Sequence, residues 1–285
     1  MGHNSIAVRK IAGALGAEVV GVDLSQPLDD DTYGAVRRAF VEHGVIFFRD
    51  QVLTPETQKR LTRRFGPFGA TPFVKTLDGH PEIIAVVKEA SDVRTHNFGG
   101  TWHSDFSFLE HPPLGSLLYA REVPPYGGDT MWTNMYLAYE TLSPGLRRTL
   151  DGLRAIHSGR RSYGLDGLFA RGQGGRSMSV NPDASGDAEV SHPVVRTHPE
   201  SGRKALYVNA VYTIRFDGWT EAESQGLLGY LHAHCVRPEF TCQFTWAKGS
   251  LAMWDNRCTQ HFAINDYDGR RREMHRTTIE GERPA

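Results

Sequence analysis

Four stretches of the chain place apolar side chains three or four positions apart, which is the spacing of an amphipathic helix. Each begins at a residue whose side chain can cap a helix: Asp30 with Asp31, Thr54, Ser143 and Thr220. Gly44 is expected to end the first helix, since glycine readily closes helices. The four apolar faces are formed by Tyr33, Val36 and Phe40; by Leu61 and Phe65; by Leu146, Leu150 and Leu153; and by Leu227, Leu228 and Leu231.

Other stretches are short and rich in β-branched, aromatic and aliphatic residues, as strands are. They are GVIFF (44–48), SLLYARE (116–122), PVVRTHP (193–199), ALYVNAVYTIRF (205–216), TCQFTWA (241–247) and SLAMWDN (250–256). Helices gather toward the first half of the chain and strands toward the second, without regular alternation. This order predicts an α+β fold with a largely antiparallel double-stranded β-helix, or jelly-roll, core flanked by helices.

The segment 159–178, GRRSYGLDGLFARGQGGRSM, is rich in glycine and arginine and has no clear periodicity. It fits two interpretations, a solvated surface loop or a lid over a pocket, because long irregular loops in compact domains often act as lids. The 285 residues of the chain suit one large domain or two small ones.

Charge and cysteine content narrow the class of protein. The formal net charge of −1 gives no electrostatic reason to expect nucleic acid or an anionic membrane as a partner. No apolar run approaches the ~20 residues that a membrane span needs. The three cysteines, Cys235, Cys242 and Cys258, form no CxxC pair, so a reduced, cytoplasmic setting is expected.

A candidate metal site begins in GGTWHSDFSF (99–108), where His103 and Asp105 lie two positions apart. On an extended strand these side chains point to the same face and can meet one ion. A third ligand is available in WDNRCTQHFAINDY (254–267), at His261. Two histidines and one carboxylate on one face of an octahedral ion are typical of iron(II) oxygenases.

Histidine pairs at the same spacing need not bind metal. His232 and His234 lie near the end of a predicted helix, where side chains two positions apart diverge by about 200°. We expect both to be surface residues near the C-terminal end of that helix, where positive charge is favoured.

Four motifs occur in the order found in a known family: WHSDFSF (102–108), GGDTMW (127–132), WDNRCTQHFAINDY (254–267) and RRREMHRTT (270–278). The chain resembles the taurine dioxygenase and dichlorophenoxyacetate dioxygenase family of Fe(II)/2-oxoglutarate-dependent oxygenases. The resemblance covers essentially the whole chain and implies a single catalytic domain over residues 1–285. It implies Fe(II), 2-oxoglutarate and O₂ as cofactor and cosubstrates, and His103, Asp105 and His261 as the iron ligands.

The resemblance also implies that Thr130 and Arg272 bind the distal carboxylate of 2-oxoglutarate, with Arg276 at the border of cosubstrate and substrate. A buried dicarboxylate needs a cation and hydrogen-bond donors, and arginine offers a planar fork suited to carboxylate. The alternative is that Thr130 is an ordinary strand residue and that both arginines are surface charges. On a strand, Arg272, Met274 and Arg276 share a face, which is unusual for a solvated edge.

Substrate residues are harder to predict. Arg276 is a candidate partner for an anionic group, and Phe106, Tyr163 and Tyr212 are candidates for an apolar wall, with ordinary core packing as the alternative. Thr71 and Gly99 stand where taurine dioxygenases have a histidine and an asparagine that hold the sulfonate. These departures predict a small organic anion such as an aryloxyalkanoate or alkyl sulfonate, rather than taurine, as the substrate.

Two other functions remain open at this stage. One is hydroxylation of a free amino acid or a biosynthetic intermediate, and the other is a non-catalytic β-barrel that only binds ligands. The intact set of candidate ligands disfavours a non-catalytic protein. A homodimer or homotetramer is expected from the resemblance.

Overall fold

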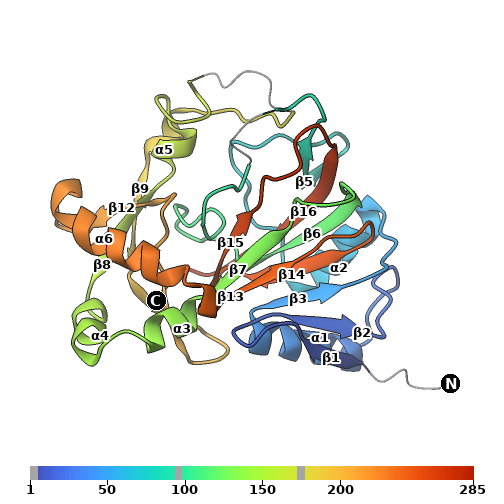
Figure 1. Ribbon diagram of the computed structural model, residues 1–285, viewed down its shortest axis with the longest axis horizontal. Helices are drawn as coiled ribbons and strands as arrows, with labels where there is room; N and C mark the ends of the chain where they lie inside the picture. Colours follow the sequence, from blue (N-terminus) through green and yellow to red (C-terminus); the bar gives the residue numbers. More distant parts are fainter. Residues whose placement is uncertain (1–5, 94–97, 172–176) are drawn as a thin grey trace.

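The structure is a computed structural model and describes residues 6–93, 98–171 and 177–285 (Figure 1). Its largest sheet has eight strands, with β2 and β3 parallel and the other neighbours antiparallel. In spatial order these are β1 (Ala7–Lys10), β2 (Ala17–Val20), β3 (Val45–Phe48), β14 (Leu251–Asp255), β6 (Gly115–Glu122), β16 (Arg272–Ile279), β5 (His80–Lys88) and β4 (Thr76–Leu77).

A smaller antiparallel sheet packs against one face of the large sheet. It consists of β13 (Thr241–Phe244), β7 (Thr130–Asn134) and β15 (Thr259–Ala263). Between the two sheets, Phe47 stacks on Phe244 with ring centroids 4.1 Å apart, and Trp132 packs against Trp254 at 5.9 Å. Two facing, largely antiparallel sheets with one apolar interior form a jelly roll, so the predicted α+β jelly-roll fold is confirmed.

The outer face of the large sheet is covered by α1 (Asp30–His43) and α2 (Pro55–Phe65). Both helices end at glycines, and α1 ends at Gly44 as predicted. Thr54 caps α2 by accepting a hydrogen bond from the backbone N–H of Thr57, also as predicted. The start of α1 differs by one residue, because Asp29 accepts from the N–H of Thr32, and Asp30 is already helical.

The rest of the chain forms a second cluster beside the jelly roll. Its strands are β8 (Arg154–Ser158), β9 (Glu189–Pro193) and β12 (Thr213–Phe216) in one sheet and β10 (Val195–Thr197) with β11 (Lys204–Leu206) in another. Its helices are α3 (Met135–Glu140), α4 (Pro144–Leu150), α5 (Arg160–Tyr163) and α6 (Glu221–Cys235), with two 3₁₀ turns at η1 (Ala184–Asp187) and η2 (Pro238–Phe240).

Three expectations about this region were wrong. The strand run 205–216 is broken, because the side chain of Asn209 accepts hydrogen bonds from two backbone N–H groups and turns the chain. The helix from Pro144 stops at Leu150, so Leu153 lies beyond it. His234 is buried rather than on the surface, and its Nε2 lies 2.9 Å from the carbonyl oxygen of Ala138.

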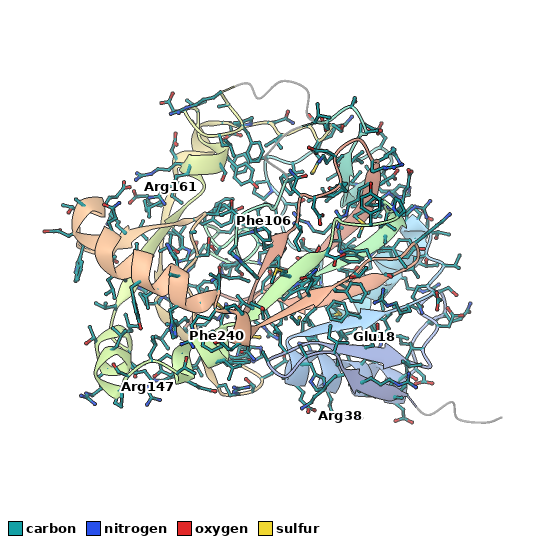
Figure 2. All side chains as sticks on the ribbon, viewed as in Figure 1. Glu18, Arg38, Phe106, Arg147, Arg161 and Phe240 are labelled. Carbon is teal, nitrogen blue, oxygen red and sulfur yellow. The ribbon has the colours of Figure 1, made fainter. Side chains whose placement is uncertain are left out.

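The glycine- and arginine-rich segment 159–178 is described except for 172–176. Contrary to expectation it is partly regular, because it begins with α5, whose Tyr163 is buried. Figure 2 shows Phe106 in the interior near this segment, whereas Arg147 and Arg161 lie at the periphery. In the described part of the chain, no helix has both the length and the apolar character needed to cross a membrane.

Candidate active site

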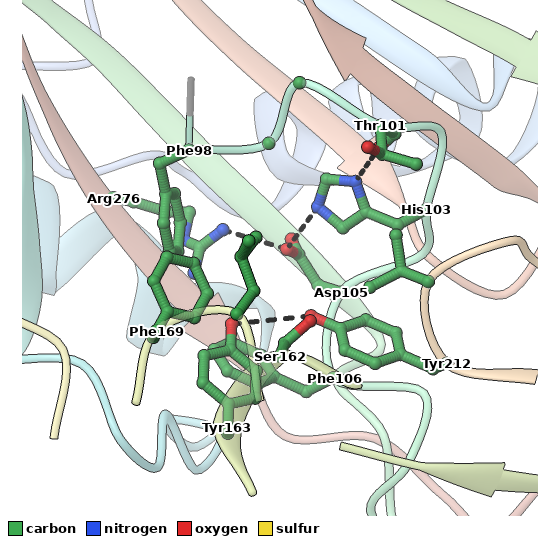
Figure 3. A pocket seen from close by; sticks show the side chains of 14 residues that line it. Phe98, Thr101, His103, Asp105, Phe106, Ser162, Tyr163, Phe169, Tyr212 and Arg276 are labelled. Atoms are coloured by element: carbon green, nitrogen blue, oxygen red, sulfur yellow. Dashed lines mark hydrogen bonds and ion pairs between the residues drawn. The ribbon is translucent and has the colours of Figure 1, made fainter. Parts of the chain in front are cut away.

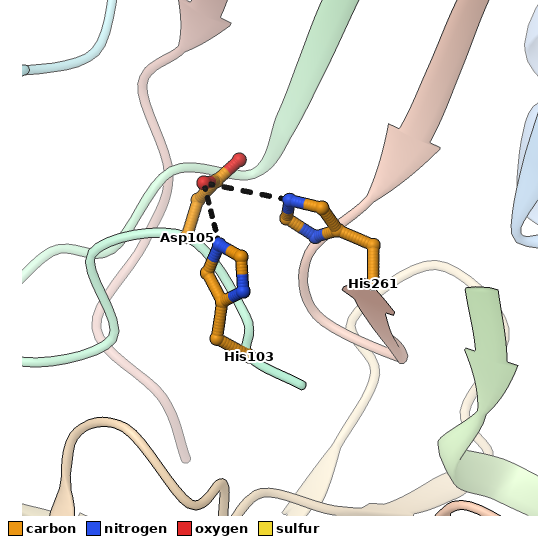
Figure 4. A group of neighbouring side chains, drawn as sticks. All are labelled: His103, Asp105 and His261. Carbon is orange, nitrogen blue, oxygen red and sulfur yellow. Dashed lines mark ion pairs between the residues drawn. The ribbon is translucent and has the colours of Figure 1, made fainter. Parts of the chain in front are cut away.

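His103, Asp105 and His261 meet beside the smaller sheet (Figure 4). His261 belongs to β15, and His103 pairs with it through backbone hydrogen bonds of 3.1 and 2.8 Å. Nε2 of His103 lies 3.7 Å, and Nε2 of His261 lies 3.9 Å, from Oδ1 of Asp105. The expected extended strand is replaced by a loop, in which His103 forms an isolated bridge and Asp105 begins a turn.

The protonation of the three groups suits a cation. Burial alone would raise the pKa of Asp105, but Arg276 and the two histidines lower it to about 2. Burial lowers the pKa of His103, and burial together with His103 lowers that of His261 well below its usual range. At neutral pH the cluster therefore offers one carboxylate and two neutral imidazoles, which are the forms that bind metal ions.

Neighbouring groups fix the orientation of the ligand atoms. Nδ1 of His103 donates to the carbonyl oxygen of Thr101 at 2.7 Å, which leaves the lone pair of Nε2 facing Asp105. Ser116 on β6 donates to Oδ2 of Asp105 at 2.7 Å. Asn256 accepts from the N–H of Asp105 and donates to Ser116, so the turn that carries Asp105 is tied to the large sheet.

The strand β16 presents Arg272, Met274 and Arg276 to the interior between the sheets, as its alternation predicted. Nη1 of Arg276 donates to Oδ1 of Asp105 at 2.8 Å. Nε and Nη2 of Arg276 are buried and have no hydrogen-bond partner in the described part of the chain. Both arginines are buried, which excludes the alternative that they are surface charges.

Arg272 is 5% exposed, and its Nε and Nη2 have no hydrogen-bond partner among the described residues. Its guanidinium carbon lies 5.8 Å from the ring centre of Trp246. Nε1 of Trp246 donates to Oγ1 of Thr130 at 3.0 Å, so the hydroxyl hydrogen of Thr130 is free to bind a ligand. Gly128 lies against this arginine, since a Cβ there would come 3.3 Å from Cδ of Arg272.

This arrangement fits iron(II) and a dicarboxylate. Two imidazole nitrogens and one carboxylate oxygen converge from one side, as in a facial triad. A buried guanidinium with unused N–H groups is unfavourable by itself, and a carboxylate would match its charge and its donors. The Thr130 hydroxyl beside it adds a further donor.

A second group of potential ligands, His198, Asp255 and Cys258, does not fit a cation. Arg257 donates to both oxygens of Asp255 at 2.8 and 2.6 Å, so that carboxylate is already matched by a positive charge. Burial and the charge of Asp255 raise the pKa of Cys258, which keeps the thiol protonated. This cluster is a buried structural ion pair.

A cavity of about 80 Å³ opens onto His103 and Asp105 of the cluster (Figure 3). Arg276 supplies the positive charge in its described lining. The predicted residues Phe106, Tyr163 and Tyr212 all line it, and each is almost fully buried. The apolar and aromatic part of the wall is formed by Phe98, Phe106, Tyr163, Leu168, Phe169, Val211 and Tyr212.

Of the two positions expected to face the substrate, Gly99 and Thr71, only the first lies in the described lining of the cavity. Gly99 lines the cavity with φ +81°, close to His103. Thr71 is absent from the described lining. Instead Phe73, two residues further on, stacks on Tyr163 with ring centroids 5.0 Å apart, so the Thr71 segment supports the wall from behind.

Several residues of the site were not predicted from the sequence. Asn256 lies inside the quoted motif 254–267, and Trp246 lies in the predicted strand 241–247, so both stood in segments already singled out. Ser116 lies in the predicted strand 116–122 and Phe169 in the segment 159–178, but their roles, like that of Phe98, depend on which distant strand or loop lies beside them.

Comparisons with known proteins agree with this geometry. The sequence pattern of the family described as "Taurine catabolism dioxygenase TauD, TfdA family" matches residues 7–278. An alpha-ketoglutarate-dependent sulfate ester dioxygenase from Pseudomonas putida is 36% identical over 292 residues, covering 98% of this chain and 90% of the relative. An alpha-ketoglutarate-dependent 2,4-dichlorophenoxyacetate dioxygenase from Cupriavidus pinatubonensis is 32% identical over 293 residues, covering 96% of this chain and 97% of the relative.

Among solved structures, a taurine dioxygenase from Burkholderia xenovorans superposes with a TM-score of 0.81 at 37% identity, covering 99% of this chain and 91% of that one. The fold, the family pattern and the relatives thus indicate the same family over nearly the whole length of this chain. The chain belongs to the TauD/TfdA family of Fe(II)- and 2-oxoglutarate-dependent dioxygenases.

Proposed function

We propose that His103, Asp105 and His261 bind the iron(II) and that Arg272 and Thr130 bind the distal carboxylate of 2-oxoglutarate. The observation that carries this assignment is the position of three ligand atoms within 4.8 Å of one another, together with two buried N–H groups of Arg272 that have no partner among the described residues. An anionic ligand would match the charge and the N–H donors of this guanidinium, and a cation would match the carboxylate and the two imidazoles of the triad.

The enzyme uses iron(II), 2-oxoglutarate and O₂, as its family does. The bound iron supplies the redox chemistry that couples decarboxylation of 2-oxoglutarate to succinate and CO₂ with hydroxylation of a substrate C–H bond. Arg276 keeps Asp105 ionised and presents two further N–H groups to the cavity. The aromatic wall excludes water and positions the apolar part of the substrate.

The substrate in this proposal is a small organic anion with an apolar body. Its acidic group pairs with Arg276, and its body lies against Phe106, Tyr163 and Tyr212. A sulfate ester or alkyl sulfonate and an aryloxyalkanoate both meet this description, and relatives are named for activity on a sulfate ester and on 2,4-dichlorophenoxyacetate. Where the hydroxylated carbon carries an ester or ether oxygen, the product collapses and that C–O bond breaks.

Hydroxylation of a free amino acid is less well supported. An α-ammonium group needs an acceptor, and Asp105 is the carboxylate in the described lining of the cavity. That carboxylate already pairs with Arg276 and faces both histidines. A non-catalytic binding protein is disfavoured by the complete set of ligands and by family membership.

Four further features belong to the same proposal. Residues 1–285 form one catalytic domain, since the large sheet draws on strands from β1 to β16. Leu168 and Phe169, in the segment 159–178, cover the cavity as a lid. A cytoplasmic location suits three cysteines that are buried and free. We also expect a dimer or tetramer, which the molar mass in solution would test.

The deciding experiment is an anaerobic titration with iron(II) and 2-oxoglutarate, followed by measurement of succinate on admission of O₂. Sulfate esters, sulfonates, aryloxyalkanoates and amino acids would be compared at equal concentration. We expect stoichiometric binding and succinate release stimulated by an organic anion with an apolar body. Binding without any stimulation by these anions, or strong stimulation by an amino acid alone, would contradict the proposed substrate class.

A further inference from the structure

Two tyrosine hydroxyls face each other in the wall of the cavity (Figure 3). Oη of Tyr163, at the end of α5, lies 3.4 Å from Oη of Tyr212, which precedes β12. The two residues are 3% and 4% exposed. Phe73 and Phe169 stack on Tyr163, and Phe108 packs against Tyr212, so both tyrosines sit among aromatic rings.

The two hydroxyl groups carry two hydrogens, but only one of these hydrogens can form the hydrogen bond between them. Burial raises the pKa of both phenols, so each hydroxyl keeps its hydrogen at neutral pH. In the described part of the chain each hydroxyl has the other as its hydrogen-bond partner. One hydrogen forms that bond and the second has no acceptor, which is unfavourable in an apolar environment unless a ligand supplies one.

The same cavity holds two other unused donors. Nε and Nη2 of Arg276 are buried and have no partner in residues 6–93, 98–171 and 177–285, while Nη1 donates to Asp105. Arg276, Tyr163 and Tyr212 all line this cavity (Figure 3). An anionic group that enters it meets two guanidinium N–H groups and one phenolic O–H.

We propose that the Tyr163–Tyr212 pair donates its spare hydrogen to the anionic group of the substrate and thereby favours a sulfate ester or sulfonate over a carboxylate. This inference rests on the proposed function. A carboxylate has two oxygens, and the Nε and Nη2 groups of one arginine match both of them. A sulfate ester or sulfonate has three terminal oxygens, and the phenolic hydrogen matches the third.

The test measures binding without turnover. The protein would be loaded with Mn(II) and N-oxalylglycine, a non-reactive isostere of 2-oxoglutarate, and titrated calorimetrically with n-hexyl sulfate, hexane-1-sulfonate and n-heptanoate, which carry the same six-carbon chain. The variants are Tyr163→Phe, Tyr212→Phe and the double variant. Tyr126→Phe is the matched control, because Tyr126 is 63% exposed and lies outside the cavity.

Either single variant leaves one hydroxyl with its own hydrogen, so at least one of them should bind n-hexyl sulfate within about threefold of wild type. The double variant should bind n-hexyl sulfate or hexane-1-sulfonate, or both, at least about tenfold more weakly, because a hydrogen bond to a charged acceptor is lost. Its affinity for n-heptanoate should change less than about threefold. A response to only one of the two sulfur anions would identify which head group the pair binds.

Unchanged affinity of the double variant for both sulfur anions would overturn the inference, as would an equal loss for n-heptanoate, which would indicate lost packing. Failure of the loaded wild type to bind either sulfur anion would also overturn it and would leave the iron and 2-oxoglutarate assignment intact. Failure of wild type to bind Mn(II) and N-oxalylglycine would contradict the proposed function itself.

Discussion

Arg276 donates a hydrogen bond from Nη1 to Oδ1 of Asp105 at 2.8 Å, and this is the same oxygen that faces the imidazoles of His103 and His261. The arginine therefore connects the metal cluster to the substrate cavity. It keeps Asp105 ionised and also offers two donors to whatever enters the cavity. In the function proposed above, a substrate anion beside Arg276 would therefore lie next to the proposed iron ligands.

Replacing Arg272 by alanine should raise the KM for 2-oxoglutarate by two orders of magnitude or more. Removing one partner of a buried ion pair is unfavourable by about 3–5 kcal/mol. Initial rates of succinate formation against 2-oxoglutarate concentration measure this. Arg271→Ala is the matched control, because Arg271 precedes β16 and pairs with Glu89, Glu122 and Glu273. An unchanged KM in Arg272→Ala would show that Arg272 does not bind the cosubstrate.

Replacing Trp246 by phenylalanine should weaken 2-oxoglutarate binding more mildly. The Thr130 hydroxyl loses the donor that orients it, and one neutral hydrogen bond contributes about 0.5–1.5 kcal/mol, so the KM should rise roughly two- to tenfold. In a protein that already carries Thr130→Val, Trp246→Phe should raise the KM little further, since both changes remove the same contact. Full additivity of the two variants would mean that Trp246 acts independently of Thr130.

Taurine should be a poor substrate. Gly99 offers no side-chain donor, and Thr71 is absent from the described lining, so the two contacts expected from these positions to the sulfonate of taurine are missing. Each contributes roughly 1.5–3 kcal/mol, which predicts a kcat/KM about two to four orders of magnitude below that of an anion with an apolar body. Succinate formation with taurine and with a phenoxypropionate at equal concentration decides this. A clear preference for taurine would refute our interpretation of the cavity.

Acid should destabilise the protein partly through His192. Burial lowers the pKa of His192 to about 4, whereas an unfolded histidine has a pKa of about 6.5. Between these values the unfolded state binds a proton that the folded state does not, so the free energy of unfolding falls as the pH drops below 6.5.

Denaturant unfolding at pH 7 and pH 5 tests this. Between pH 7 and pH 5, the free energy of unfolding of the wild type should fall by about 1–2 kcal/mol more than that of His192→Gln. In this variant the glutamine amide can retain the hydrogen bond to the carbonyl oxygen of Leu109. Equal losses in the two proteins would show that His192 is protonated as easily in the folded state as in the unfolded one.

Local sequence signals predicted the features that depend on neighbours along the chain. The caps at Thr54 and Thr220 need residues only three positions away, and the inward face of Arg272, Met274 and Arg276 follows from strand alternation. The pairing of His103 with His261 in one cluster was predicted only from the family motifs. These residues are 158 positions apart in the sequence, and a backbone bridge brings them together in the fold.

Features that depend on loop conformation could not be predicted. Phe106 adopts φ +46°, which residues with side chains rarely do, and this turn replaces the expected strand around Asp105. The contact between Trp246 and Thr130 joins β7 to the loop after β13, 116 positions away, and Tyr163 is packed against Phe73. No pattern of apolar positions marks these pairs.

The most direct test of the iron site is the affinity for Mn(II), measured by electron paramagnetic resonance, in wild type and in His103→Ala, Asp105→Ala and His261→Ala. His111→Ala serves as the control, because His111 is exposed and away from the cluster. We expect one Mn(II) per chain in wild type and in the control, and affinity reduced at least about a hundredfold in each cluster variant, with circular dichroism unchanged. A folded His261→Ala protein that binds Mn(II) as tightly as wild type would contradict the account.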